Sequence, residues 1–285
     1  MFRCLYVCVL GAVLGLSACN GSGGGSPSPV VSPTPVVSAS PVPPADELLR
    51  RVATQEGATD STSEMRLVIE SDGGREQVDF RLRRRYTPEA ISTLLEVTGP
   101  REETDKALLT IERPGKPTEA FSYLAGLKKV AKLSSMSALT LRGTKITIQE
   151  LLWLELTQYT AGTGERAVDG ETTLLKYTLT APADRNLAFP QIVAMFRESD
   201  LAPAKFELYG QANKLQKIAR IDEVKKIDGR LTMTRIAIDD QVQKRKLMLS
   251  TNSVTFNTGL SAKLFTERNL ISLIESASSR LLEGK

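Results

Sequence analysis

The fold of this chain is decided by Met65-Arg66-Leu67-Val68-Ile69-Glu70, which continues through Asp72-Gly73-Gly74 into Gln77-Val78-Asp79-Phe80-Arg81-Leu82-Arg83. Both outer segments place apolar residues at every second position, which is the period of a β-strand with one buried face. Two glycines after an aspartate are typical of the tight turn between two such strands. The stretch therefore predicts an antiparallel β-hairpin.

The same period of two continues through most of the chain. Since no long helical pattern separates the apolar segments, they predict strands of one antiparallel meander. Between Met233 and Ile236 the apolar parity switches, which indicates a β-bulge or a strand buried on both faces. The further strands are expected at residues 91–98, 106–113, 119–124, 172–180, 191–198, 204–210, 215–225, 230–238 and 244–257.

Three short segments have the period of a helix instead of a strand. Leu48, Leu49 and Val52 would share one face of a helix, and residues 149–156 and 269–282 predict two further helices. So few helices cannot cover one face of a large sheet. The sheet must then bury its apolar face by curving into a barrel, either closed or open with short helices as a lid.

The N-terminal part of the chain differs in character from the rest. Residues 1–18 predict a secretory signal peptide, since a basic start precedes an apolar run too short for the roughly 20 residues of a membrane span. Residues 19–45 combine Cys19 with a segment rich in Gly, Ser, Pro and Val, which predicts a stiff linker without a core. We expect residues 46–285 to form one folded domain.

The end of the signal peptide, Leu16-Ser17-Ala18-Cys19, resembles a bacterial lipobox. That resemblance implies cleavage after Ala18 and attachment of diacylglycerol and an N-acyl chain, such as palmitate, to Cys19. The alternative is a core cysteine at the end of an apolar segment. Acylation by two or more chains would anchor the domain stably to a membrane.

Composition excludes several classes of protein. The chain has no histidine, so Ser-His-Asp and Cys-His catalysis are excluded and the commonest transition-metal ligand is missing. Lys and Arg total 37 against 33 Asp and Glu, a balance that gives no case for nucleic-acid binding. Removal of the signal leaves Cys19 as the one cysteine, so no intrachain disulfide can form. We expect no catalytic residues, no metal and no other cofactor.

Residues 121–133, which mix lysines with apolar side chains, resemble the basic-apolar segment of the LolA-like outer-membrane lipoprotein-sorting family, a superfamily with LolA, LolB and LppX types. Residues 143–151, 227–230 and 264–270 resemble later motifs of the family, in the family's order. The resemblance covers residues 46–271, which is nearly the whole expected domain.

The resemblance implies an unclosed antiparallel β-barrel with short helices as a lid and no enzymatic activity. In the family, acyl chains enter the apolar hollow of the sheet. The chain would then be a lipid-anchored, periplasm-facing carrier or acceptor of lipids or lipoproteins in their sorting and transport to the outer membrane. Its partners would be acyl chains, the membrane that holds Cys19, and a membrane transporter or carrier protein. Ala125 and Lys145 depart from the family pattern near the lid, which leaves the cargo open.

Two further inferences concern the place and the role of the domain. Asn20, directly after the expected acylated cysteine, resembles a signal that does not retain a lipoprotein in the inner membrane. We therefore expect an anchor in the outer membrane rather than the inner one. The alternative role on the same fold is an envelope sensor or protein-interaction module, and a hydrolase is a third possibility that no motif supports.

Two sets of residues are candidates for contact with a lipid or a partner. Apolar and aromatic residues of the expected strands, with the single tryptophan, are candidates for lining the hollow, and plain core packing is the alternative for each. These are Val78, Phe80, Leu95, Val97, Leu109, Ile111, Phe121, Tyr123, Trp153, Phe196 and Phe206. Basic residues are candidates for contact with headgroups or a partner, and the alternatives are a charged strand edge or a solvated face. These are Arg83, Arg84, Arg85, Lys128, Lys129 and Lys132.

Overall fold

A computed structural model of the chain divides into two units, Met1–Ser40 and Pro41–Lys285. All residues that the structure describes belong to the second unit. The expected signal peptide, Cys19 and most of the expected linker therefore lie outside them, as does almost all of the helix expected at 149–156. The described residues are 41–101, 104, 106–124, 129–133, 156–185 and 187–273.

The second unit consists mainly of β-strands. Its described helical parts are α1 (Ala45–Ala53), the 3-10 turns η4 (Leu156–Gln158), η5 (Gln211–Asn213) and η6 (Ala262–Leu264), and residues 267–273. The first strands are β1 (Asp60–Ser71), β2 (Gly74–Tyr86), β3 (Ile91–Gly99), β4 (Ala107–Glu112), β5 (Glu119–Leu124), β6 (Lys129–Lys132) and β7 (Thr160–Ala161). The later strands are β8 (Glu165–Asp169), β9 (Thr172–Thr180), β10 (Gln191–Arg197), β11 (Pro203–Tyr209), β12 (Leu215–Ile227), β13 (Arg230–Asp240) and β14 (Arg245–Phe256).

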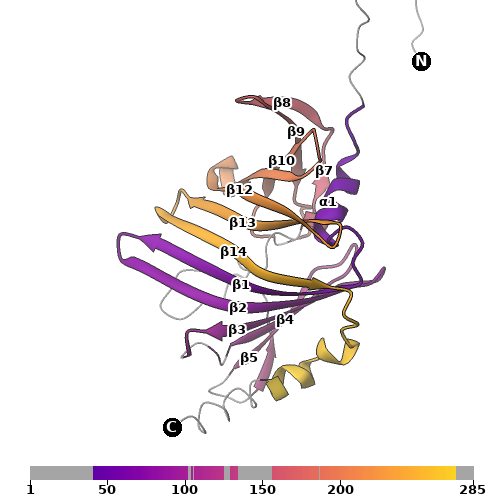
Figure 1. Cartoon of the computed structure of the whole chain (residues 1–285), viewed down its shortest axis with the longest axis vertical. Helices are drawn as coiled ribbons and strands as arrows, with labels where there is room; N and C mark the ends of the chain where they lie inside the picture. Colours follow the sequence, from indigo (N-terminus) through magenta and orange to yellow (C-terminus); the bar gives the residue numbers. More distant parts are fainter. Residues whose placement is uncertain are drawn as a thin grey trace, which may run out of the picture. The chain divides into compact units, whose positions relative to one another are not determined.

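These strands form one antiparallel sheet with the order β6-β5-β4-β3-β2-β1-β14-β13-β12-β11-β10-β9-β7, and β8 also pairs with β9 (Figure 1). The order consists of two meanders, which meet where β1 pairs with β14. The terminal strands β6 and β7 do not pair with each other in the described residues, so the sheet does not close. This arrangement confirms the expected mainly β fold with an unclosed antiparallel barrel.

The strand positions follow the period of the sequence closely. The nine strands expected after the hairpin each have an observed counterpart whose ends differ by at most two residues. The hairpin itself is longer than its apolar alternation, because β1 begins at Asp60 and β2 runs on to Tyr86. The expected bulge lies in the β12–β13 pair, where the register shifts on both sides of Glu223. The short strands β6, β7 and β8 were not expected.

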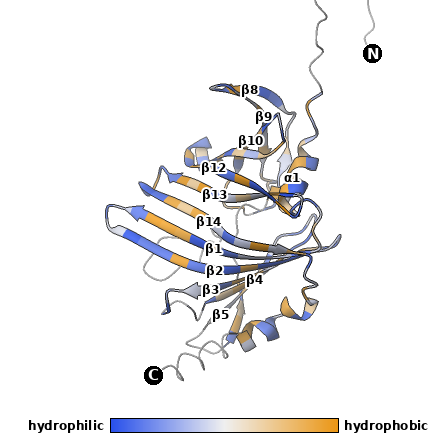
Figure 2. Cartoon of the chain, viewed as in Figure 1, coloured by the Kyte–Doolittle hydropathy of each residue, from blue (hydrophilic) through white to orange (hydrophobic). Residues whose placement is uncertain are grey.

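Successive side chains of a strand point to opposite faces of the sheet. Both faces of this sheet carry a cluster of buried apolar residues. Figure 2 shows this alternation of hydrophobic and hydrophilic residues along the strands. The face that contacts α1, called the inner face, carries the larger buried cluster, which includes Leu48 and Leu49 of α1. Leu94 and Leu95 are neighbours in β3 and fully buried, yet they belong to the outer-face and inner-face clusters, respectively.

The outer face of β3 to β5 is covered by the C-terminal part of the described chain. Phe265 and Leu270 are buried in one cluster with Leu94, Leu109 and Phe121. Figure 1 shows this segment, in yellow, leaving β14 and lying beside β5. An apolar segment of the chain itself thus covers a part of the outer face that would otherwise be exposed.

This segment begins at a turn that the Asp60 carboxylate holds. Asp60 accepts hydrogen bonds from the backbone N–H groups of Thr258 (2.8 Å), Gly259 (3.0 Å) and Leu260 (3.3 Å), and from the Thr258 hydroxyl (2.9 Å). Burial raises the pKa of Asp60, but these hydrogen bonds outweigh it and leave the pKa below its ordinary value. The start of β1 is therefore tied to the point where the chain crosses to the outer face.

Candidate functional site

A pocket of about 80 Å³ lies between the C-terminal end of α1 and the inner face of the sheet. Its walls come from α1 and the turn after it, from η4, and from β1, β2, β13 and β14. The lining residues are Val52, Ala53, Gln55, Ser61, Ser63, Met65, Leu82, Arg84, Tyr86, Leu156, Thr232, Met233, Ile236, Leu249, Thr251 and Val254.

One wall of this pocket is apolar. Leu82, Met65, Leu249 and Ile236 come from β2, β1, β14 and β13, which are adjacent in the sheet in that order. Val52 of α1 also lines the pocket. Burial of hydrocarbon against such a wall gains about 0.8 kcal/mol per methylene. The wall is thus suited to an alkyl chain.

The lining of the pocket becomes polar near the start of β1 and the end of β2, which lie side by side in the sheet. Ser63 and Ser61 continue the inner-face series of β1, and Arg84 and Tyr86 continue that of β2. The Ser61 and Tyr86 hydroxyl oxygens lie 3.1 Å apart and share a hydrogen bond. Burial raises the pKa of Tyr86, and the neighbouring Arg84 partly opposes this rise. Arg84 is the only charged side chain among the described residues that line the pocket.

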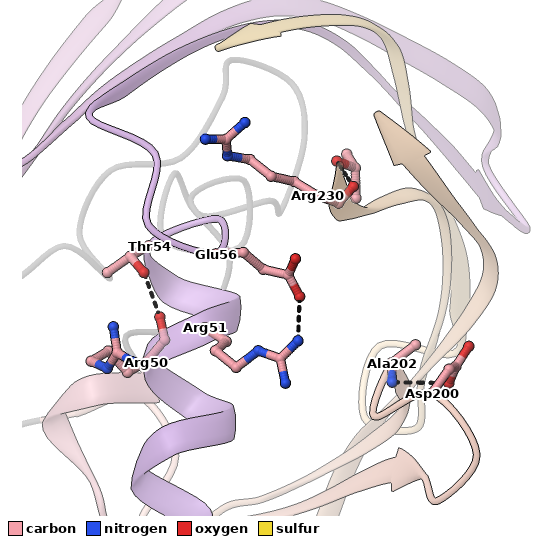
Figure 3. Close-up of polar contacts among 8 residues, drawn as sticks. Arg50, Arg51, Thr54, Glu56, Asp200, Ala202 and Arg230 are labelled. Atoms are coloured by element: carbon pink, nitrogen blue, oxygen red, sulfur yellow. Dashed lines mark hydrogen bonds and ion pairs between the residues drawn. The ribbon is translucent and has the colours of Figure 1, made fainter. Parts of the chain in front are cut away.

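The turn from α1 to β1 contributes to the same pocket. Gln55, Glu56 and Gly57 have φ angles of 48°, 54° and 82°, a left-handed conformation that is costly for the two residues with a Cβ. Arg51 of α1 donates a hydrogen bond to Glu56 (Nη2 to Oε1, 2.7 Å) and so ties the turn to the helix (Figure 3). The Oε1 atom of Gln55 is buried and has no hydrogen-bond partner in the described part of the chain.

A smaller pocket of about 20 Å³ adjoins the first one. The two pockets share Val52, Gln55 and Met233. Figure 3 shows the β10–β11 and β12–β13 connections, marked by Ala202 and Arg230, on the side that faces α1. The same end of α1 therefore contributes to both pockets.

The apolar candidates from the sequence lie in the packed clusters. Trp153 lies outside the described residues, and none of the other candidates lines either pocket. Their contact with a lipid stays a prediction. The candidates in the inner-face cluster are Val78, Phe80, Leu95, Val97, Phe196 and Phe206. Those in the outer-face cluster are Leu109, Ile111, Phe121 and Tyr123.

The residues that do line the pocket were mostly not singled out from the sequence. Met65 and Leu82 belong to the hairpin that decides the fold, but their alternation does not distinguish a lining residue from a packed one. One signal in the sequence could have located the pocket. At Ser61, Ser63 and Arg84, polar residues occupy the alternate positions that the apolar inner-face residues occupy elsewhere in β1 and β2. There the strands continue although the apolar series has ended.

The basic run on β2 is divided between the two faces. β2 pairs with β1 and β3, so the alternative of a charged strand edge was wrong. On the outer face, Arg81 pairs with Glu64 (Nε to Oε1, 2.5 Å) and Arg83 pairs with Glu96. Desolvation lowers the pKa of Arg83. Arg85 has the same parity as these two residues, whereas the remaining arginine of the run faces the pocket.

The lysine candidates lie near the β6 end of the sheet. Lys129 is exposed on β6, and Lys128 lies outside the described residues. Lys132 donates a hydrogen bond to Glu119 (Nζ to Oε1, 2.8 Å). Hydrogen bonds from Lys132 and a neighbouring arginine lower the pKa of Glu119 to about 2. Contact of these lysines with headgroups or a partner stays a prediction.

Two other kinds of site were sought in the described part of the chain. No helix there is long and apolar enough to cross a membrane. The same residues contain no group of three or more Cys, Asp or Glu side chains that could hold a metal ion. The pocket beside α1 is therefore the candidate site that the described residues offer.

Comparison with known sequences places the chain in one protein family. A family model described as "uncharacterized protein" matches residues 90–272. No curated protein sequence matches the chain. Because the matched region includes strands of both meanders, the match spans most of the sheet.

Several solved structures share the fold. A DUF1329 family protein from Desulfovibrio piger superposes with a TM-score of 0.70 at 17% identity, over 79% of this chain and 97% of that one. A domain from Vibrio parahaemolyticus, described as an outer membrane lipoprotein-sorting protein, gives a TM-score of 0.70 at 20% identity, with the same coverage of 79% and 97%. A LolA superfamily protein from Nitrosomonas europaea gives 0.65 at 16% identity, over 79% and 99%. At these identities, the likeness establishes the fold.

Proposed function

We propose that this chain, which belongs to the family matched over residues 90–272 and has the fold of LolA-superfamily proteins, is a lipid-anchored carrier or acceptor of acyl chains. It would face the periplasm and act in the sorting of lipids or lipoproteins to the outer membrane. The observation that carries the proposal is the apolar pocket between α1 and the inner face of the unclosed sheet. No covalent chemistry is needed, because burial of methylenes supplies the free energy of binding.

The size of the pocket adds a mechanical requirement. Sites for drug-sized ligands usually have volumes of about 300–1,000 Å³. A pocket of about 80 Å³ therefore holds only part of a long acyl chain. Uptake of the whole chain requires α1 to move away from the sheet, which would join the two pockets. The buried Leu48 and Leu49 oppose that movement, so binding and the displacement of α1 are coupled in this proposal.

The expected anchor gives this carrier a limited range. Acylation at Cys19 would keep the domain on a membrane, and the proline-rich linker would let it reach ligands nearby. Such a protein works as a tethered acceptor or a short-range relay rather than as a free shuttle. The Vibrio parahaemolyticus protein, with its lipoprotein-sorting description, supports this choice of cargo.

The proposal is tested by lipid binding to the whole chain carrying Cys19→Ala, which removes the expected acylation site. We expect mass spectrometry of a solvent extract to show a co-purified lipid, and a fluorescent fatty acid to bind the delipidated protein. Ala53→Phe would fill the pocket from α1 and weaken this binding at least tenfold. Val168→Phe is the matched control, because Val168 is 76% exposed on β8.

Two outcomes would contradict this function. The first is a protein that carries no lipid and takes up no fluorescent fatty acid. The second is a pair of Phe variants that bind equally well, since the pocket beside α1 would then not be the site. A stable complex with another envelope protein in crosslinked cells, unchanged by Ala53→Phe, would favour an interaction module instead.

A further inference from the structure

We infer that the polar end of the pocket binds the anionic headgroup of the lipid, a carboxylate or a phosphate, with Arg84 as its main contact. This inference rests on the proposed function and specifies the class of ligand. It places the headgroup inside the pocket, between α1 and the sheet, rather than in solvent. The alkyl chain would then lie along the apolar wall formed by Leu82, Met65 and Leu249.

The first support is a row of polar residues across the inner face. Ser61 of β1 is the register partner of Arg84 of β2, Arg84 is the partner of Thr93 of β3, and Thr93 is the partner of Thr110 of β4. Partners in adjacent antiparallel strands place their side chains about 4.5–5.5 Å apart on one face. The row is therefore one continuous polar strip, and its first two members line the pocket.

The second support is unused hydrogen-bonding capacity in this row. Thr93 and Thr110 are each 1% exposed, and neither hydroxyl has a hydrogen-bond partner in the described part of the chain. Buried polar groups normally have a partner, and leaving one unpaired costs about 1–3 kcal/mol. The strip beside Arg84 thus stays polar beyond the pocket, although neither threonine lines the pocket.

The third support is the charge of the lining. Arg84 is its only charged residue among those described. The Ser63 hydroxyl, and whichever of the Ser61 and Tyr86 hydroxyls does not donate to the other, add donors around it. A guanidinium has five N–H donors, so Arg84 can keep its contacts within the protein and still bind two oxygens of a ligand. Glu112 raises the pKa of Tyr86 and so lies close to this end, but it does not line the pocket.

Size also favours a headgroup at this position. About 80 Å³ accommodates a carboxylate or a phosphate with a few carbon atoms. Among the residues of β1 and β2 that line the pocket, the apolar Met65 and Leu82 lie at one end, and the polar residues lie toward the other. These polar residues are Ser61, Ser63, Arg84 and Tyr86. An amphiphile that reversed its direction would place methylenes against Arg84 and leave its guanidinium without the anion.

The test compares three single-chain lipids that share a palmitoyl chain, using the full chain with Cys19→Ala. These are palmitate, palmitoyl lysophosphatidic acid and the uncharged monopalmitoylglycerol, each measured by displacement of a fluorescent fatty acid. We expect the two anions to bind at least about tenfold more tightly than the glycerol ester. Arg84→Met should bring the anions down to the affinity of the ester and leave the ester unchanged. Arg84→Lys should retain part of the preference.

Arg85→Met is the matched control, because it removes an arginine from the adjacent position of the same strand but from the opposite face. It should leave all three affinities as they are. The two anions distinguish a fatty acid from a phospholipid as the source of the headgroup. Equal binding of charged and uncharged lipids, or an unchanged preference in Arg84→Met, would overturn this inference while leaving the carrier function intact. Failure of all three lipids to bind would overturn both.

Discussion

The two faces of β2 carry the same kind of side chain in opposite settings. On the outer face, Arg81 and Arg83 form ion pairs with Glu64 and Glu96 of the neighbouring strands. On the inner face, Arg84 lies in the lining of the pocket with hydroxyl groups around it. The difference follows from strand parity alone, since one step along the chain moves a side chain from one face to the other.

This comparison separates what stabilises the sheet from what the sheet can bind. The inner-face series of β2 before Arg84 consists of Val78, Phe80 and Leu82, all buried. Stability should therefore depend on these apolar residues, because an ion pair as exposed as that of Arg81 and Glu64 contributes little. Binding should depend on the place where the apolar series ends. The predictions below test each part of this division.

The largest effect is expected on the inner face, at Phe80. Its side chain is 0% exposed, so Phe80→Ala removes a ring from a close-packed cluster and leaves a cavity. We expect a loss of about 3–5 kcal/mol in the free energy of unfolding, measured by chemical denaturation. Arg81→Ala, one residue further on the outer face, should cost less than about 1 kcal/mol. Similar losses for both variants would abolish the distinction between the faces.

A smaller effect is expected where the chain crosses from one face to the other, at Asp60. Asp60→Ala removes the acceptor for Thr258, Gly259 and Leu260 and should cost about 2–3 kcal/mol. Hydrogen exchange should show loss of protection in residues 257–273 before the rest of the sheet. Asp184→Asn is the control, since the Asp184 side chain is 78% exposed. A variant as stable as the wild type would mean that the outer-face segment holds itself in place.

The contribution of Asp60 also has a defined dependence on pH. Its pKa is lower in the folded than in the unfolded chain, so the folded state binds this proton less readily. The stability gained is therefore fully present above the unfolded value of about 3.9 and is lost as pH falls through the lower folded pKa. The difference in stability between the wild type and Asp60→Asn should shrink below about pH 4. A difference that stayed constant with pH would show that the carboxylate charge has no part in it.

Much of the fold could be predicted from the sequence because alternation reports directly on strands. The hairpin at 65–83 and the strands after it were located by period and turn residues. The shortage of helix predicted a barrel, either closed or open, and the unclosed form was what the resemblance to the LolA-like family implied. The outer-face cover was not predicted. The contacts that hold it join Asp60 to residues about 200 positions further on, and no local pattern encodes such a pairing.

The site was predicted less well than the fold. Period identifies which face a residue such as Phe80 or Leu82 occupies, but it cannot tell whether another side chain fills the space in front of it. Of these two residues, only Leu82 lines the pocket, which lies between α1 and the sheet. Arg84 was named from its charge among neighbours of the same kind, and its position in the pocket depends on the length of β2, which runs beyond the apolar alternation.

The smallest effect is expected for the ion pair between Arg81 and Glu64 on the outer face. The two side chains are 36% and 38% exposed, so water and salt screen their attraction. A double-variant cycle with Arg81→Met and Glu64→Leu should give a coupling energy below about 1 kcal/mol, decreasing as salt is added. Neither variant should change the affinity for palmitate, because both residues lie away from the pocket lining. A coupling of several kcal/mol, or a change in binding, would mean that the outer face contributes directly to stability or function, and the division between the two faces of β2 would have to be given up.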